Sequence, residues 1–133
     1  MTLVDTNVLL DLVTNDPQWS EWSLARLEEA ALSGPVLIND VVYAETSIRY
    51  DLIEDLDSML TETMIEIAPM PRAALFLAGK VFQQYRSAGG VRTGVLPDFF
   101  IGAHAAIEGW QLLTRDARRY RTYFPKLALT APD

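Results

Sequence analysis

Residues 2–13 have the sequence TLVDTNVLLDLV, and this stretch decides the predicted fold. It begins with an apolar run, residues 2–5, that is typical of a short buried strand and ends in an acid, Asp5. The apolar residues that follow recur at helical spacing and predict a short helix over residues 6–13. A strand that leads directly into a helix is the repeating unit of parallel α/β folds.

The rest of the chain repeats this alternation. We expect a single domain over residues 1–133, an α/β fold of three α/β/α layers with a central parallel sheet. Glycine and proline pairs such as Gly34-Pro35 and Gly89-Gly90 separate the elements. The further predicted strands are residues 36–38, 64–67, 110–114 and 127–129, and the further predicted helices are about residues 16–32, 40–48, 51–63, 71–86 and 98–108, with a short basic helix from Asp116.

The composition is ordinary for a soluble globular protein, with 50% hydrophobic and 22% charged residues. The chain has no cysteine, which excludes disulfides, thiolate zinc sites and cysteine nucleophiles. It shows neither a secretion signal nor an apolar run of the roughly 18 to 20 residues that cross a membrane. We therefore expect a cytoplasmic protein that does not contact membranes.

Charge is divided unevenly along the chain. Residues 1–70 carry two basic and fourteen acidic residues, whereas residues 71–133 carry nine basic and four acidic ones, within a net charge of −7. The acidic total argues against a protein that coats nucleic acid nonspecifically. A local basic cluster either contacts phosphates or forms a solvated helix face that pairs with the acidic half. This cluster consists of Arg115, Arg118, Arg119, Arg121 and Lys126.

Four acidic residues stand where such a fold would bring them together. Asp5 and Asp116 each follow an apolar strand, Asp98 lies at a helix start, and Glu45 lies early in a helix. In a parallel sheet the strand ends and the adjoining helix starts share one edge, where ligands bind. Four carboxylates would repel one another there unless a cation held them, and oxygen ligands suit Mg²⁺ or Mn²⁺. The pattern therefore predicts a metal-dependent hydrolase of phosphate esters.

The four acids have different expected roles. We expect Asp5 and Asp98 to contact the metal directly. Glu45 and Asp116 either bind a second metal ion or orient the attacking water, and the sequence does not distinguish these alternatives. Glu45 carries special weight, because an acid in an otherwise apolar helix needs a partner when it is buried.

Four short segments, taken in order, resemble the motifs of the PIN domain family. They span residues 3–116, and the chain length further resembles the VapC toxins of bacterial and archaeal type II toxin–antitoxin systems. One departure is Gly102, where alanine is commoner in the family. The segments are residues 5–12 (DTNVLLDL), residues 42–45 (VYAE), residues 96–105 (LPDFFIGAHA) and residues 113–116 (LTRD).

The resemblance implies a PIN-like fold and a ribonuclease that depends on Mg²⁺ or Mn²⁺ and hydrolyses RNA phosphodiester bonds. It also implies a homodimer that a small antitoxin protein silences. The family's catalytic, metal-binding acids fall on Asp5, Glu45, Asp98 and Asp116, and its supporting polar positions fall on Asn7 and Thr114.

The predicted substrate-binding residues are Asn7, Thr114, Arg115 and Arg118. Asn7 and Thr114 either hydrogen-bond the carboxylates or bond only the nearby backbone. Arg115 and Arg118 are expected to contact an RNA phosphate or an antitoxin carboxylate, and these two roles are compatible.

Several other residues receive a structural interpretation. His104 follows Asp98 by six residues, about 600° around a helix, so we expect it at the surface or an interface rather than in catalysis. We also expect Asp11 at the surface. Trp19 and Trp22 belong either to the core or to a partner groove. An apolar strip is expected mainly to pack in the core, with an antitoxin helix as the alternative occupant; it consists of Leu52, Leu56, Met59 and Leu60.

Three rival functions remain at this point. The first is a PIN nuclease that acts in RNA processing or on DNA, and the second is a non-catalytic interaction domain whose acids only cap helices. The third is a phosphatase with an aspartyl nucleophile. It is disfavoured because Asp5-Thr6-Asn7 lacks a second aspartate two residues on, and no lysine stands near the fourth motif.

Overall fold

The computed structural model of the chain describes residues 1–92 and 94–132. Its centre is a five-stranded sheet in the order β3-β2-β1-β4-β5, and every neighbouring pair is parallel. The first strand therefore lies in the middle, with Thr2 opposite both Val36 and Gln111. The strands are β1 (Thr2–Val4), β2 (Val36–Asn39), β3 (Ile65–Ala68), β4 (Gln111–Leu113) and β5 (Leu129–Thr130).

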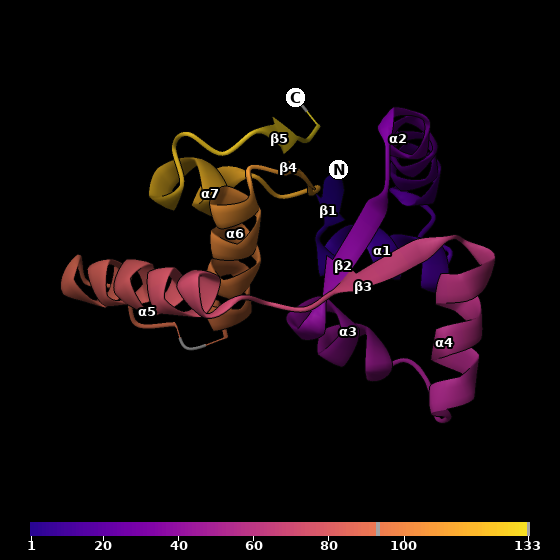
Figure 1. Cartoon of the computed structure of the whole chain (residues 1–133), viewed down its shortest axis with the longest axis horizontal. Coiled ribbons are helices and arrows are strands. Elements are labelled where there is room, and N and C mark those ends of the chain that lie inside the picture. The colour runs from indigo at the N-terminus through magenta and orange to yellow at the C-terminus, as the bar shows by residue number, and fades with distance from the viewer. Residues whose placement is uncertain (93, 133) are drawn as a thin grey trace.

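Helices cover both faces of this sheet. Figure 1 shows α1 and α2 on one side of the sheet, and α6 with α7 on the other, where α5 packs against α6. This arrangement confirms the predicted α/β/α layers. The helices are α1 (Thr6–Val13), α2 (Ser20–Ser33), α3 (Asp40–Ser47), α4 (Ile53–Glu62), α5 (Arg72–Ser87), α6 (Leu96–Glu108) and α7 (Arg118–Tyr123).

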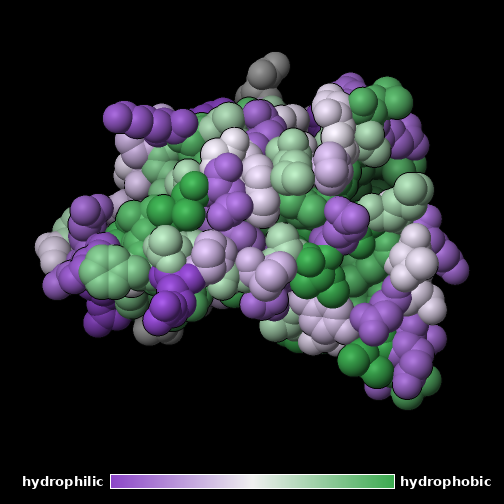
Figure 2. Space-filling view, viewed as in Figure 1, coloured by the Kyte–Doolittle hydropathy of each residue, from purple (hydrophilic) through white to green (hydrophobic). Residues whose placement is uncertain are grey.

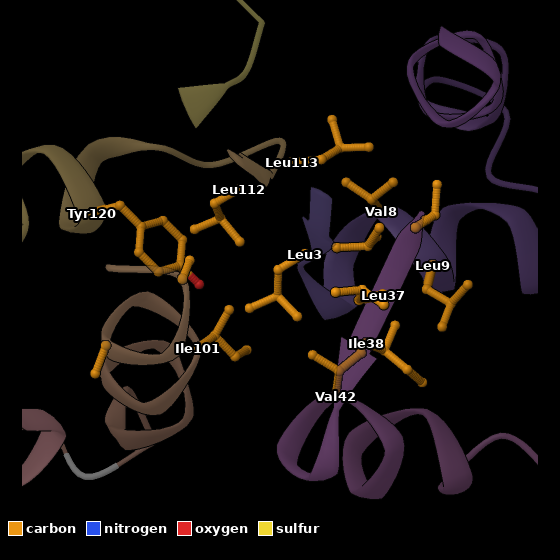
Figure 3. Close-up of a cluster of buried hydrophobic side chains, with 14 of the residues drawn as sticks. Leu3, Val8, Leu9, Leu37, Ile38, Val42, Ile101, Leu112, Leu113 and Tyr120 are labelled. Carbon is orange, nitrogen blue, oxygen red and sulfur yellow. The ribbon is translucent and has the colours of Figure 1, made fainter. Parts of the chain in front are cut away.

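The core lies on both faces of the short central strands. Leu3 and Leu112 are fully buried, and Figure 3 shows them directed toward Ile101 and Tyr120 of the α6 and α7 layer. The opposite face is filled from α1, where Val8 is also fully buried. Burying such side chains contributes roughly 1.5–3 kcal/mol each to the free energy of folding, so these contacts fix where the strand ends lie.

Gly102 lies where α6 and the end of α7 pack closely together. It lies in α6 beneath the ring of Phe124, and a Cβ atom at this position would stand 2.5 Å from Cε2 of that ring. Such a contact is far inside van der Waals distance, so the ring seats directly on the helix backbone. The glycine therefore lets the end of α7 pack closely on α6.

Some element boundaries differ from the prediction. The second helix begins at Ser20 rather than near residue 16, because Asp16 caps a separate turn by accepting the N–H groups of Gln18 and Trp19. In α4, Leu56 and Leu60 are buried as expected, whereas Leu52 is 58% exposed. Figure 2 shows hydrophobic side chains interspersed with hydrophilic ones where Figure 1 places the start of α4.

His104 is buried, so its predicted place at the surface is wrong. The helical angle does turn it away from Asp98, but α6 is packed on nearly its whole circumference and the side away from Asp98 is not solvent. Its Nδ1 lies 3.2 Å from Nδ2 of Asn39, and its ring packs against Trp110. Burial lowers the pKa of His104, which favours a neutral ring in this position.

None of the helices in the described ranges combines the length and the apolar character needed to cross a membrane.

Candidate active site

Asp5 lies at the centre of the candidate site, directly after β1. Its backbone N–H donates to the carbonyl of Leu113 at 2.9 Å, which joins the ends of the two central strands. The residue also caps α1, because its Oδ1 accepts the N–H of Thr6 at 2.7 Å. The strand-to-helix turn therefore places this carboxylate at the carboxyl edge of the sheet.

The second oxygen of Asp5 is held by side chains from distant segments. Oδ2 accepts the hydroxyl of Thr114 at 2.8 Å and the hydroxyl of Tyr120 at 2.9 Å, and Nδ2 of Asn7 lies 3.4 Å away. The carboxylate is only 4% exposed, so these bonds leave it little freedom to rotate. Its orientation is set before any ligand arrives.

This environment shifts the acidity of Asp5 strongly. Burial raises its pKa from the ordinary value of 3.8 to about 6, and the nearby charge of Asp98 adds to this effect. The hydrogen bonds from Thr114, Tyr120 and Thr6 act in the opposite direction without cancelling the effect of burial. A buried carboxylate without a matching positive charge is costly, and a bound cation would relieve that cost.

Asp98 lies in the first turn of α6 and carries an ion pair. Its Oδ2 accepts NH1 of Arg119 at 2.5 Å, and both side chains are partly buried. Burial raises the pKa of Asp98, the Arg119 guanidinium lowers it, and the charges of Glu45 and Asp116 raise it again. Asp98 therefore interacts electrostatically with each of the other three predicted acids, Asp5, Glu45 and Asp116.

Glu45 and Asp116 flank the two central carboxylates. Glu45, from α3, accepts the hydroxyl of Thr6 at its Oε1 at 2.6 Å, so the start of α1 orients it. Asp116 is exposed and lies 3.6 Å from Nε of Arg118. It lines an open cavity of about 350 Å³ together with Arg118, Arg119, Thr122 and Tyr123.

Asn7 and Thr114 lie between these acids and connect them. Nδ2 of Asn7 approaches Oγ1 of Thr114 at 3.3 Å, and that oxygen accepts the backbone N–H of Asp116 at 3.1 Å. Oδ1 of Asn7 accepts the backbone N–H of Arg115 at 3.2 Å. Asn7 and Thr114 both bond the Asp5 carboxylate, which is the first of the two predicted alternatives for this pair. Their predicted contact with substrate stays a prediction.

Asp11 is buried, so its predicted surface position is wrong. Its two oxygens accept Nε and NH2 of Arg115 at 2.9 and 3.0 Å, and Oδ2 also accepts the hydroxyl of Ser23. The Arg115 guanidinium lies over the ring of Trp19, 5.5 Å from its centroid. The reason for the burial is therefore a partner 104 residues away in the chain, which no local pattern indicates.

The two arginines predicted to bind substrate differ in their freedom. Arg115 is held by Asp11 in a forked pair, whereas the side chain of Arg118 is 91% exposed. Contact of either one with a phosphate stays a prediction. Trp19 and Trp22 pack edge to face and are each partly buried.

Three contributors to the site are absent from the predicted set: Thr6, Arg119 and Tyr120. Arg119 belongs to the predicted basic cluster, but its pairing with Asp98 joins segments 21 residues apart. The role of Tyr120 is indicated by one sequence feature: a tyrosine in a short basic helix next to an acidic motif is suited to hydrogen-bond a carboxylate.

The donor set fits a hard divalent cation in its chemistry, because it consists of carboxylate oxygens. Across residues 1–92 and 94–132, however, no three histidine, aspartate or glutamate side chains already converge into a metal cage. The Arg119 guanidinium stands on Asp98, where a positive charge is needed. This guanidinium supplies a positive charge at Asp98.

Comparison with known proteins identifies the domain. The model of the PIN domain matches residues 2–125, and PIN domains are generally nucleases. No curated protein matches the chain in sequence.

Several solved structures share the fold at low sequence identity. VapBC2 from Rickettsia felis, bound to a DNA fragment from its promoter, matches with a TM-score of 0.75 and 22% identity over 99% of this chain and 98% of that chain. FitAcB from Neisseria gonorrhoeae matches with a TM-score of 0.69 and 20% identity, covering 97% of this chain and 96% of that one. A toxin–antitoxin complex from Klebsiella pneumoniae matches with a TM-score of 0.64 and 21% identity, over 100% and 98% of the two chains. The match to the domain model over nearly the whole length is the decisive finding: the chain belongs to the PIN domain family.

Proposed function

We propose that the protein is a metal-dependent endoribonuclease that acts as the toxin of a type II toxin–antitoxin pair. The observation that carries the proposal is the buried Asp5 carboxylate, fixed at the sheet edge by Thr6, Thr114 and Tyr120 and surrounded by three further acids. A structural acid of this kind would need a paired cation, and the neighbouring charge that acts on Asp5 is the negative charge of Asp98.

Asp5 and Asp98 are the residues that would hold Mg²⁺ or Mn²⁺. Bound there, the ion would supply an activated water and polarise the phosphoryl oxygens of RNA. Tyr120 serves as a fixed hydrogen-bond donor to Asp5, because burial and neighbouring carboxylates raise its pKa well above 10 and keep its proton in place. The Thr114 hydroxyl also donates to Asp5, so the two bonds hold the Asp5 carboxylate in one orientation.

Glu45 and Asp116 complete the proposed site from its two sides. The hydroxyl of Thr6 orients Glu45, and the Thr114 hydroxyl holds the backbone at Asp116. Each either binds a second ion or orients the attacking water. We propose that Arg118, which is exposed beside Asp116 and lines the open cavity, contacts an RNA phosphate.

The toxin role is supported by family membership and by shared fold. Structures with this fold include a toxin–antitoxin complex, and the present chain covers nearly the same length. We accordingly propose a cytoplasmic homodimer that a small antitoxin protein silences. Leu52 and Ile53, at the start of α4, are exposed apolar side chains that such a partner could cover.

The test is cleavage of mixed cellular RNA by the purified, partner-free protein, with Mg²⁺ and Mn²⁺ titrated and EDTA as a control. Asp98→Asn keeps the side-chain shape and removes the charge, so it should abolish cleavage. Asp51→Asn is the matched control, because it removes one exposed carboxylate from the connection before α4. Cleavage that persists in EDTA or in Asp98→Asn would contradict the proposal, and cleavage of DNA alone would redirect it to a different substrate.

A further inference from the structure

Two consecutive residues of α7 reach the two central carboxylates. Tyr120 donates its hydroxyl to Asp5, and Arg119 donates NH1 to Asp98 at 2.5 Å. The two contacts differ in kind. The tyrosine bond is buried and adds no charge, whereas the arginine places a full positive charge on the carboxylate.

The ion pair of Arg119 is selective within its segment. Arg115, four residues earlier, is engaged by Asp11, and Arg118 points at Asp116 with most of its side chain in solvent. Within residues 1–92 and 94–132, Asp98 forms one ion pair, and Arg119 is its partner. The side chains of the pair are 26% and 33% exposed, so solvent can reach both partners.

We infer that Arg119 is an internal counter-ion that occupies Asp98 in the metal-free protein and that a divalent cation must displace. This inference rests on the proposed function. A guanidinium bonded to Oδ2 places a full positive charge beside the oxygen that a metal ion would approach, so the two cations repel each other and compete for Asp98. Arg119 is a positioning residue in this scheme, because it acts through Asp98.

The ion pair also balances charge within the site. Arg119 neutralises Asp98 against the charges of Glu45 and Asp116, which would otherwise repel it. The same contact lowers the affinity for metal, because only the fraction of molecules with a free Asp98 is ready to bind.

The first experiment is calorimetric titration of the full chain with Mn²⁺. Compared proteins are the wild type, Arg119→Gln and Arg121→Gln. If the pair is closed about nine-tenths of the time, its removal should tighten Mn²⁺ binding about tenfold. Arg121 lies on the same short helix and is exposed, so its substitution removes an equal charge without touching Asp98. We expect Arg121→Gln to change the affinity by less than about twofold.

The titration separates the failure of this inference from the failure of the proposed function. Equal Mn²⁺ affinity in wild type and Arg119→Gln, or equal gains in Arg119→Gln and Arg121→Gln, would overturn the counter-ion alone. If no variant binds Mn²⁺ while each unfolds cooperatively on heating, both the counter-ion and the metal-dependent function are wrong.

A second measurement keeps the inference testable if Arg119→Gln does not fold. The Nε–Hε resonances of Arg119 and Arg115 in the wild type would be followed by NMR during titration with diamagnetic Mg²⁺. We expect the Arg119 resonance to shift, while Arg115, held by two bonds to Asp11, stays in place. An Arg119 resonance that does not move at saturating Mg²⁺ would overturn the displacement.

Discussion

Asp5 and Asp98 are held in opposite ways, although both lie at the same edge of the sheet. Asp5 is fixed by hydroxyl and N–H donors that bring no net charge, and its pKa rises to about 6. Asp98 is only partly buried and is held by the charge of Arg119. The fold itself therefore orients Asp5, the inner carboxylate. Asp98, the outer carboxylate, is instead balanced by the Arg119 guanidinium, which we propose a metal ion displaces.

The largest effect is expected when the inner carboxylate, Asp5, loses its charge. Asp5→Asn should lower kcat/KM for RNA cleavage by roughly 10³-fold, because the charge that would hold the metal is lost. Circular dichroism should show an unchanged fold. Activity within tenfold of wild type would show that Asp5 is structural.

A second prediction uses the raised pKa of Asp5 in metal-free protein. The folded pKa of about 6 exceeds the ordinary value of 3.8, so the folded state holds this proton more tightly. The contribution of Asp5 to the free energy of unfolding is therefore present below about pH 4 and is lost as the pH rises through 6. The loss amounts to about 3 kcal/mol.

Urea unfolding of wild type and Asp5→Asn in EDTA, from pH 4 to 7.5, measures this loss. The stability of the wild type relative to the variant should fall by about 2 kcal/mol over that range, because the rest of the loss lies below pH 4. A difference that does not change with pH would contradict the buried, metal-free carboxylate.

The third prediction concerns the uncharged groups that donate hydrogen bonds to Asp5. Tyr120→Phe removes one hydroxyl and keeps the ring, so cleavage should fall about 10- to 100-fold as the carboxylate loses its orientation. Tyr43→Phe is the matched control, because the hydroxyl that it removes bonds Asp57 of α4 and no acid of the site. Equal effects of the two substitutions would show that the lost bond to Asp5 is not what lowers cleavage.

The smallest expected effect is at Thr6, which orients Glu45 from outside the central pair. Thr6→Val keeps the shape and removes the hydroxyl that bonds Oε1, so kcat should fall by about three- to tenfold. Thr61→Val, on the exposed face of α4, should leave kcat unchanged. A loss above 100-fold at Thr6 would place Glu45 among the residues that directly bind metal.

The fold could be predicted from local patterns because β1 to β4 are short, mainly apolar strands, each followed by a helix. The position of the acids followed from the same rule, since residues at strand ends and helix starts meet at one edge of a parallel sheet. Residues 2–13 illustrate this, with β1 and α1 observed within one residue of their predicted bounds.

Pairing between distant side chains could not be predicted in the same way. Asp11 has the spacing of an exposed helix residue, yet Arg115 and Ser23 bury it. His104 points away from Asp98 as expected, but the other face of its helix is also covered. Helical periodicity tells which face a residue occupies, whereas the partner that meets this face depends on the tertiary packing.

The most direct test of the account is a crystal structure of the wild-type protein soaked with Mn²⁺, measured for anomalous scattering. The account predicts an anomalous peak at about 2.1 Å from carboxylate oxygens of both Asp5 and Asp98, with Arg119 moved off Asp98. A peak elsewhere, or no peak while Arg119 stays bonded to Asp98, would contradict it.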